Sequence, residues 1–200
     1  MDDGDIKNWK LIWINKSIQF ITMSEAKMSL DDETEEVFYF CSSTEKTKDS
    51  LSGKIVKRGM SKLLAATFDK ENETSEDNPF KLEGVSDEHM KHIFAYLKTY
   101  ENKEEVSPPM PADSKKSIDA ILGDVDAKLF AYTIDPKKSS KDNMLTAFVM
   151  AETIEWMGMI KYADKLSCII AKYMQGKDIE VIKSESDYIK KSMKELAKSD

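Results

Sequence analysis

Three of the chain's five prolines fall within residues 108–111, inside a stretch of polar and charged residues. Proline has no amide hydrogen and a fixed φ angle, so a cluster of prolines ends a helix and interrupts a sheet. The apolar pattern also stops over residues 101–116. The sequence therefore predicts an extended, solvated, Pro-rich linker at residues 106–122 between two regions of different architecture.

The region before the linker alternates short strands with helices. Residues 37–41, Val-Phe-Tyr-Phe-Cys, are aromatic and few, which is typical of a buried strand. A polar turn is expected through residues 43–52. Residues 53–68 then predict one broken helix or two short ones, because apolar residues recur at helical spacing and Gly59 weakens the middle.

A second helix of this region begins after an extended piece at residues 80–85. Ser86 can cap its first turn, and the acidic residues that follow suit the positive end of a helix dipole. Its apolar residues recur at i, i+3, i+4 and i+7, which predicts one buried stripe: Met90, Ile93, Phe94 and Leu97.

Two acidic tracts and the N-terminal segment complete this half. Residues 31–36 and 70–78 predict solvated loops because they carry almost no apolar side chain. Residues 9–23 alternate apolar and polar positions around a polar turn, which predicts a β-hairpin. A loosely attached arm is the alternative, but Trp9 and Trp13 favour a hairpin that docks on another surface.

The region after the linker predicts mostly helices. A short helix at residues 126–132 should stop before Pro136, and residues 143–156 are apolar almost all round, so that helix should be buried on more than one side. Residues 162–174 form a stripe that ends at Gly176. The last helix, residues 178–197, carries a narrow seam typical of packing on a neighbouring helix or in a partner's groove: Ile179, Ile182, Ser186, Ile189, Met193 and Leu196.

Charge and cysteine content exclude several classes of function. Thirty Lys and Arg against 37 Asp and Glu give a net charge of −7, which argues against binding to nucleic acid or to an anionic membrane surface. No apolar run reaches the roughly 18 residues of a transmembrane helix. Two cysteines, Cys41 and Cys168, make no disulfide framework. We expect a cytoplasmic or nuclear protein.

No catalytic or cofactor motif appears. The seven glycines are scattered, so no phosphate-binding loop is present. His89 and His92 could hold a metal if a third ligand approached, but such pairs are common on helix surfaces. Neither cysteine has a general base beside it in the sequence, so both are interpreted as buried apolar residues. We expect no enzymatic activity, no metal and no cofactor.

The order of these segments resembles the Skp-type adaptor of SCF cullin–RING ubiquitin ligases, a BTB/POZ-fold family. The closest stretch is residues 156–177, from Trp156 to the Gly176-Lys177 pair, which resembles the family's tyrosine–leucine–x–isoleucine run and the helix that closes with glycine–lysine. The similarity spans about residues 37–183. Beyond Lys177 the sequence departs from the family's pattern, and the hairpin at residues 9–23 has no counterpart in it.

The resemblance implies an α+β fold, in which a BTB/POZ-like domain precedes a helical C-terminal module of the F-box-binding type. The expected boundaries are an N-terminal extension at 1–36, the BTB/POZ-like domain at 37–105, the linker at 106–122 and the helical module at 123–200.

The resemblance also implies two partner faces. Glu155 and Trp156 fall where the family has an asparagine–tyrosine pair that faces the cullin. The residues implied to pack against an F-box-type protein are Leu166, Ile169, Ile170, Met174, Ile179 and Ile182.

Two hypotheses of function follow. The first is a non-enzymatic adaptor that links an F-box receptor to a cullin. The second is a structural or self-assembling subunit without a ligase role. Its partner face would use Trp9, Trp13, Ile189, Met193 and Leu196.

Overall fold

The computed structural model describes residues 36–68, 74–108 and 115–196. The predicted hairpin lies outside the described residues, and so do Trp9 and Trp13. The described elements are β1 (Val37–Cys41), β2 (Lys48–Ser52), α2 (Gly53–Lys57), α3 (Lys62–Thr67), β3 (Phe80–Lys81), α4 (Asp87–Thr99), α5 (Ile118–Leu122), α6 (Asp124–Leu129), η1 (Ala131–Thr133), α7 (Ser140–Met157), α8 (Ile160–Met174) and α9 (Ile179–Leu196). The fold is therefore mixed α+β, as expected.

The sheet has the strand order β2-β1-β3, with β1 in the centre. β1 pairs antiparallel with β2, so that Phe38 lies opposite Leu51, and parallel with β3. The predicted strand at 37–41 is confirmed. The predicted polar turn through residues 43–52 is wrong at its second half, which forms β2. Leu51 is the only apolar residue of β2, and pairing with β1 compensates for its low strand propensity.

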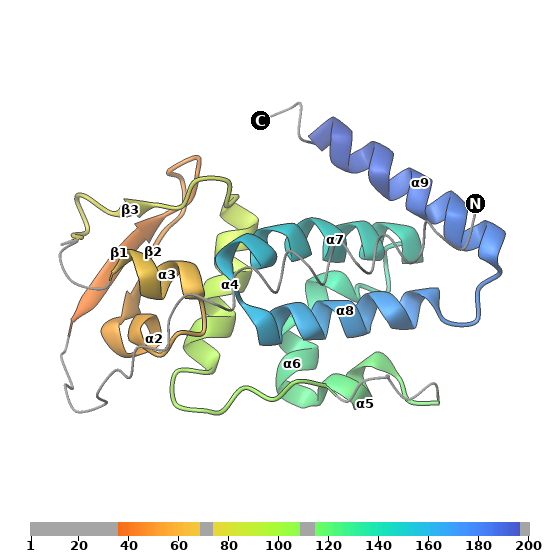
Figure 1. The fold of residues 1–200 in the computed structure, drawn as a ribbon, viewed down its shortest axis with the longest axis horizontal. Helices are drawn as coiled ribbons and strands as arrows, with labels where there is room; N and C mark the ends of the chain where they lie inside the picture. The colour runs from red at the N-terminus through yellow and green to blue at the C-terminus, as the bar shows by residue number, and fades with distance from the viewer. Residues whose placement is uncertain (1–35, 69–73, 109–114, 197–200) are drawn as a thin grey trace. The chain divides into compact units, whose positions relative to one another are not determined.

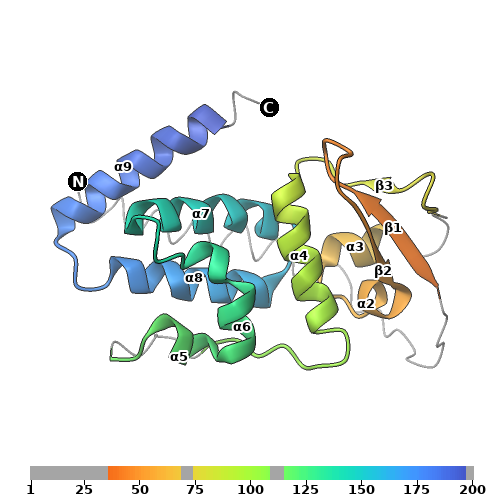
Figure 2. The same cartoon turned by 180° about the vertical axis from the view of Figure 1, so that it is seen from behind.

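Helices follow β2 and β3, and serine caps explain where they begin. The segment at 53–68 forms two helices, α2 and α3, with Gly59 between them at φ +75°. Ser52, Ser61 and Ser86 accept hydrogen bonds from backbone amides in the first turns of α2, α3 and α4. The predicted stripe of α4 is buried. α4 lies between the sheet and the helices α7 and α8 (Figures 1 and 2).

The predicted linker is partly wrong. Its second half contains α5, which Ser117 caps through the amide of Ala120, and the side chain of Ile121 is buried. Pro108 is also buried. The sequence of α5 is too short to show a helical stripe by itself, so α5 depends on the contact that it makes with α6 and α8. In the remaining region, the predicted helices correspond to α6 with η1, α7, α8 and α9.

One apolar core connects the two halves of the fold. It contains Phe40 and Leu97 from the first half, and Met150 and Leu166 from the second. All the described residues belong to one compact unit. The core therefore continues across the linker that the sequence predicts.

A buried ion pair lies within this core. Lys165 of α8 is 1% exposed, and its Nζ is 3.0 Å from Oδ2 of Asp126 in α6. The same Nζ donates to the Tyr96 hydroxyl at 3.1 Å, and the Tyr100 hydroxyl donates to Oδ1 of Asp126 at 2.7 Å. Burial, followed by contact with this carboxylate, raises the pKa of Tyr100 above its ordinary value. The network joins α4, α6 and α8 through polar groups that satisfy one another.

None of the described helices is both long enough and apolar enough to span a membrane.

Candidate protein-binding surface

α7 and α8 meet at a tight corner. α7 ends because Gly158 adopts a left-handed conformation, with φ +67° and ψ +33°. Its amide donates to the carbonyl of Glu155 at 3.0 Å, and the amide of Met159 donates to the carbonyl of Ile154 at 3.1 Å. These bonds close the last turn of α7 in the manner of a glycine C-cap. Since α8 begins at Ile160, only two residues join the helices, and the corner has little freedom.

The corner is also attached to α3 and α4. The hydroxyl of Ser61, the residue that caps α3, donates to the carbonyl of Met157 at 2.9 Å, and both atoms are buried. Nδ1 of His89 in α4 lies 2.9 Å from Oγ1 of Thr153 in α7. A Cβ atom placed on Gly158 would lie 2.8 Å from Cβ of Lys62 in α3. These contacts hold the end of α7 in one position against the sheet half of the fold.

We expect that replacing Gly158 with alanine will destabilise the protein by at least about 1–2 kcal/mol, the cost of a side chain in the left-handed region. The close approach of Lys62 should add to this cost, because the two Cβ atoms cannot come so near. Gly176→Ala is the matched control, since Gly176 also has a positive φ, of +74°, but no neighbouring atom within 4 Å. Urea denaturation measures the stability that each of the two variants loses. Equal losses would mean that packing on Lys62 contributes nothing.

Two large apolar side chains are exposed at the corner. Trp156, at the end of α7, is 50% exposed, and Ile160, at the start of α8, is 56% exposed. Glu152 and Glu155 are also exposed on the last two turns of α7. Partial burial, and then repulsion from Glu155, raises the pKa of Glu152 above its ordinary value. The corner therefore presents an apolar surface beside two carboxylates.

The resemblance implies that Glu155 and Trp156 face a cullin, and both are exposed in the last turn of α7 at this corner. Sequence reasoning did not identify Ile160 or Glu152. Glu152 lies four residues before Trp156, a spacing that puts both on one face of a helix. Ile160 lies four residues after Trp156 but beyond the glycine stop, and its exposure depends on how the two helices turn.

Two residues predicted to bind an F-box-type protein are core residues instead. Leu166 and Ile169 are 0% exposed and belong to the apolar core, because their face of α8 packs on the chain itself. Ile170 and Met174 are partly buried, Ile182 is partly buried in α9, and Ile179 is 60% exposed. Of the six, only the four toward the α8–α9 junction keep surface that a partner could contact.

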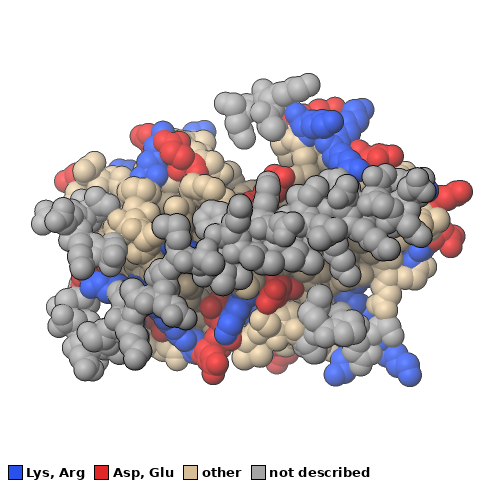
Figure 3. Space-filling model, viewed as in Figure 1, with Lys and Arg blue, Asp and Glu red and all other residues tan. Residues whose placement is uncertain are grey.

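The seam of α9 is partly used within the chain. Ile189 is 4% exposed, whereas Met193 is partly buried and Leu196 is 48% exposed. Polar contacts attach α9 to the start of α7: the Tyr188 hydroxyl donates to Oδ1 of Asp142 at 2.9 Å. Ile189 is thus unavailable as a partner residue in this conformation. Figure 3 shows Lys side chains gathered over α9, with acidic side chains beside them.

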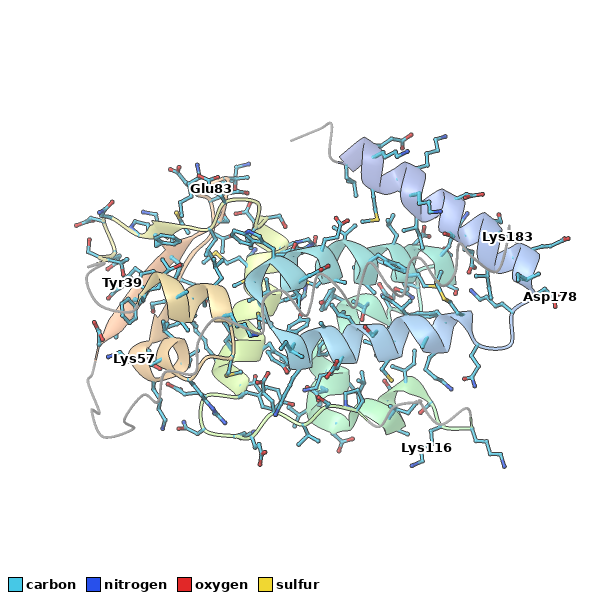
Figure 4. All side chains as sticks on the ribbon, in the orientation of Figure 1. Tyr39, Lys57, Glu83, Lys116, Asp178 and Lys183 are labelled. Carbon is cyan, nitrogen blue, oxygen red and sulfur yellow. The ribbon has the colours of Figure 1, made fainter. Side chains whose placement is uncertain are left out.

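The junction and the corner lie at opposite ends of α8. This helix has 15 residues, so its ends are roughly 20 Å apart. Figure 4 shows Asp178 and Lys183 at the start of α9, far from Tyr39 in β1 and Lys57 in α2. The chain therefore offers two separate surfaces.

The histidines make contacts within the fold. His89 bonds Thr153, and the ring of His92 stacks on Tyr132 with centroids 3.8 Å apart. Burial lowers the pKa of both imidazoles. Within residues 36–68, 74–108 and 115–196, no three His, Cys, Asp or Glu side chains are grouped to hold a metal. Cys41 and Cys168 are buried thiols whose pKa burial raises.

Comparison of the sequence with models of protein families and with curated proteins finds no match.

Proposed function

We propose that the protein is a non-enzymatic adaptor of the Skp type in the cytoplasm or nucleus, which contacts a cullin at the α7–α8 corner and an F-box-type receptor at the α8–α9 junction. The observation that carries this proposal is the half-exposed Trp156 on a rigid corner. Tryptophan is one of the residue types enriched among interface residues that dominate binding energy. A fixed backbone lowers the entropic cost of association.

The separation of the two surfaces supports the same function. An adaptor must bind two proteins at once, and partners at the two ends of α8 need not collide. At the junction, Ile179 and the partly buried Ile170, Met174 and Ile182 supply apolar surface of the kind that a partner helix covers. The mixed α+β order, with helices after a small sheet, is compatible with the resemblance in residues 156–177.

Purification of the native protein with its bound proteins, followed by mass spectrometry, tests this proposal. A cullin together with F-box proteins would support it. A stable complex that contains neither would exclude it.

We expect Trp156→Ala to weaken cullin binding by at least about 2 kcal/mol, roughly 30-fold in Kd, because the indole is the largest apolar group at the corner. Isothermal titration with the captured cullin measures this loss. Val125→Ala is the control, since Val125 is 43% exposed on α6. Unchanged binding by Trp156→Ala would remove the corner from the interface.

Self-association is a second candidate. Ile179 and Val181 are 60% and 45% exposed at the start of α9, and two copies could bury them against each other. In that case the mass from light scattering should rise with protein concentration, and Ile179→Asp should abolish the rise. A mass that stays at 22.8 kDa at all concentrations would exclude this function.

A further inference from the structure

The end of α7 carries negative charge without a compensating cation. The carbonyl end of a helix is the negative end of its dipole, and Lys or Arg is the favourable residue there. The last turn of α7 has no basic residue, yet it contains Glu155, and Glu152 lies one turn earlier. No ion pair is found for either carboxylate among the described residues. Partial burial of Glu152, and then repulsion from Glu155, oppose its ionisation and raise its pKa.

The neighbouring basic residues are engaged elsewhere or remain apart. Lys161, at the start of α8, donates to the backbone carbonyl of Glu105 at 2.6 Å. The side chain of Lys62 packs on the corner at Gly158, but it forms no ion pair with Glu152 or Glu155. The two carboxylates can therefore accept a cation from outside the chain.

Trp156 determines which cation suits this position. Residues at i and i+4 of a helix are neighbours on its surface, so Glu152 and Trp156 share one face at the end of α7. A cation held there would contact an aromatic ring and two carboxylates together. Guanidinium stacks on aromatic rings, is more weakly hydrated than ammonium, and can bind two oxygen atoms at once. Arginine therefore fits better than lysine.

We propose that the end of α7 binds an arginine side chain of a partner protein, with the guanidinium between the Trp156 indole and the carboxylates of Glu152 and Glu155. An apolar residue next to that arginine packs on Ile160, which is 56% exposed. This inference deepens the proposed function by naming the chemistry of the partner, and it rests on that function in treating the corner as an interface.

Peptide titration tests the inference without an identified partner. Three capped peptides carry Arg, Lys or citrulline beside a leucine and are otherwise identical; citrulline has nearly the shape of arginine but no charge. The full chain with Trp9→Phe and Trp13→Phe retains Trp156 as its single tryptophan, so its emission reports binding there. The indole N–H resonance of Trp156 in the unaltered chain provides the same measurement if that variant misfolds.

We expect the arginine peptide to bind with a Kd on the order of 1 mM, the lysine peptide roughly tenfold more weakly, and the citrulline peptide not at all. Glu152→Gln with Glu155→Gln should abolish the preference for arginine. The control Glu180→Gln, on the exposed start of α9, should retain it. Equal binding of the three peptides, no binding of the arginine peptide up to 10 times the expected Kd, or a preference that survives the double variant would overturn the inference.

The two proposals can fail separately. Cullin binding that requires Trp156 but is indifferent to Glu152→Gln with Glu155→Gln would keep the adaptor function and remove the arginine site. A preference for arginine in a protein that captures no cullin would keep the arginine site and remove the adaptor function.

Discussion

Lys165→Met should cost the folded protein about 3–5 kcal/mol, the range for breaking a buried ion pair by removing one partner. Methionine fills much of the lysine's volume, so the loss would arise mainly from Asp126. This carboxylate would remain buried with the Tyr100 hydroxyl as its hydrogen-bond donor and without its cation. Denaturation in urea, followed by far-UV circular dichroism, measures the change. The unfolding slope m should stay constant if only stability changes.

A double variant separates the charge from the packing. Lys165→Met with Asp126→Leu removes both charges, and a buried pair replaced by apolar residues is often neutral or stabilising. We therefore expect the double variant to recover most of the stability that Lys165→Met loses. Both variants remove the hydrogen bonds that Lys165 donates to Tyr96 and Tyr100, so this loss cancels, whereas only the double variant also removes the Asp126 acceptor of the Tyr100 hydroxyl. A double variant as unstable as the single one would mean that Lys165 acts through packing alone.

Phe40→Ala should also cost about 3–5 kcal/mol, because truncating a buried phenylalanine loses apolar burial and opens a cavity. Phe40 is 0% exposed on the central strand. Its ring meets three others edge-on, at centroid distances of 5.3 Å from Phe68, 6.4 Å from Phe80 and 5.4 Å from Phe94. These rings belong to the end of α3, to β3 and to α4, so one side chain connects three segments.

Tyr39→Ala is the matched control, since successive side chains of a strand point to opposite faces and Tyr39 is only partly buried. Its backbone amide bonds Oγ1 of Thr74, a contact that the substitution leaves in place. We expect a clearly smaller loss from Tyr39→Ala in the same urea titration, and Phe40→Leu should fall between the two. Similar losses at positions 39 and 40 would contradict the assignment of the core to one face of β1.

The predicted helices with long apolar stripes and clear caps agree with the structure. Ser86 begins α4, Gly176 follows the end of α8 at φ +74°, and the seam at 178–197 forms α9. Periodicity and capping are local properties, so they can be read from neighbouring residues. Glu155 and Trp156 were found from a resemblance, and their exposure was not deducible from the sequence.

The sequence pattern failed for elements whose formation depends on contacts with another element. β2 has a single apolar residue and α5 is too short to show a helical stripe, so each forms because another element pairs with it or packs on it. Leu166 and Ile169 belong to the same apolar stripe as Ile170 and Met174. No sequence pattern separates the fully buried pair from the partly exposed pair. Their burial depends on which part of the α8 surface the rest of the chain covers.

The sequence by itself determined that strands and helices are both present, and it located the aromatic strand at 37–41 and the main helices, since 2-residue and 3.6-residue periods, serine caps and glycine stops act over a few residues. Only the tertiary structure decided that Lys165 meets Asp126, that Ser61 fixes the end of α7 across 96 residues of chain, and that Trp156 and Ile160 stay exposed at one corner. These features depend on which faces meet in space, and the free energy of such long-range contacts is absent from any local window of sequence.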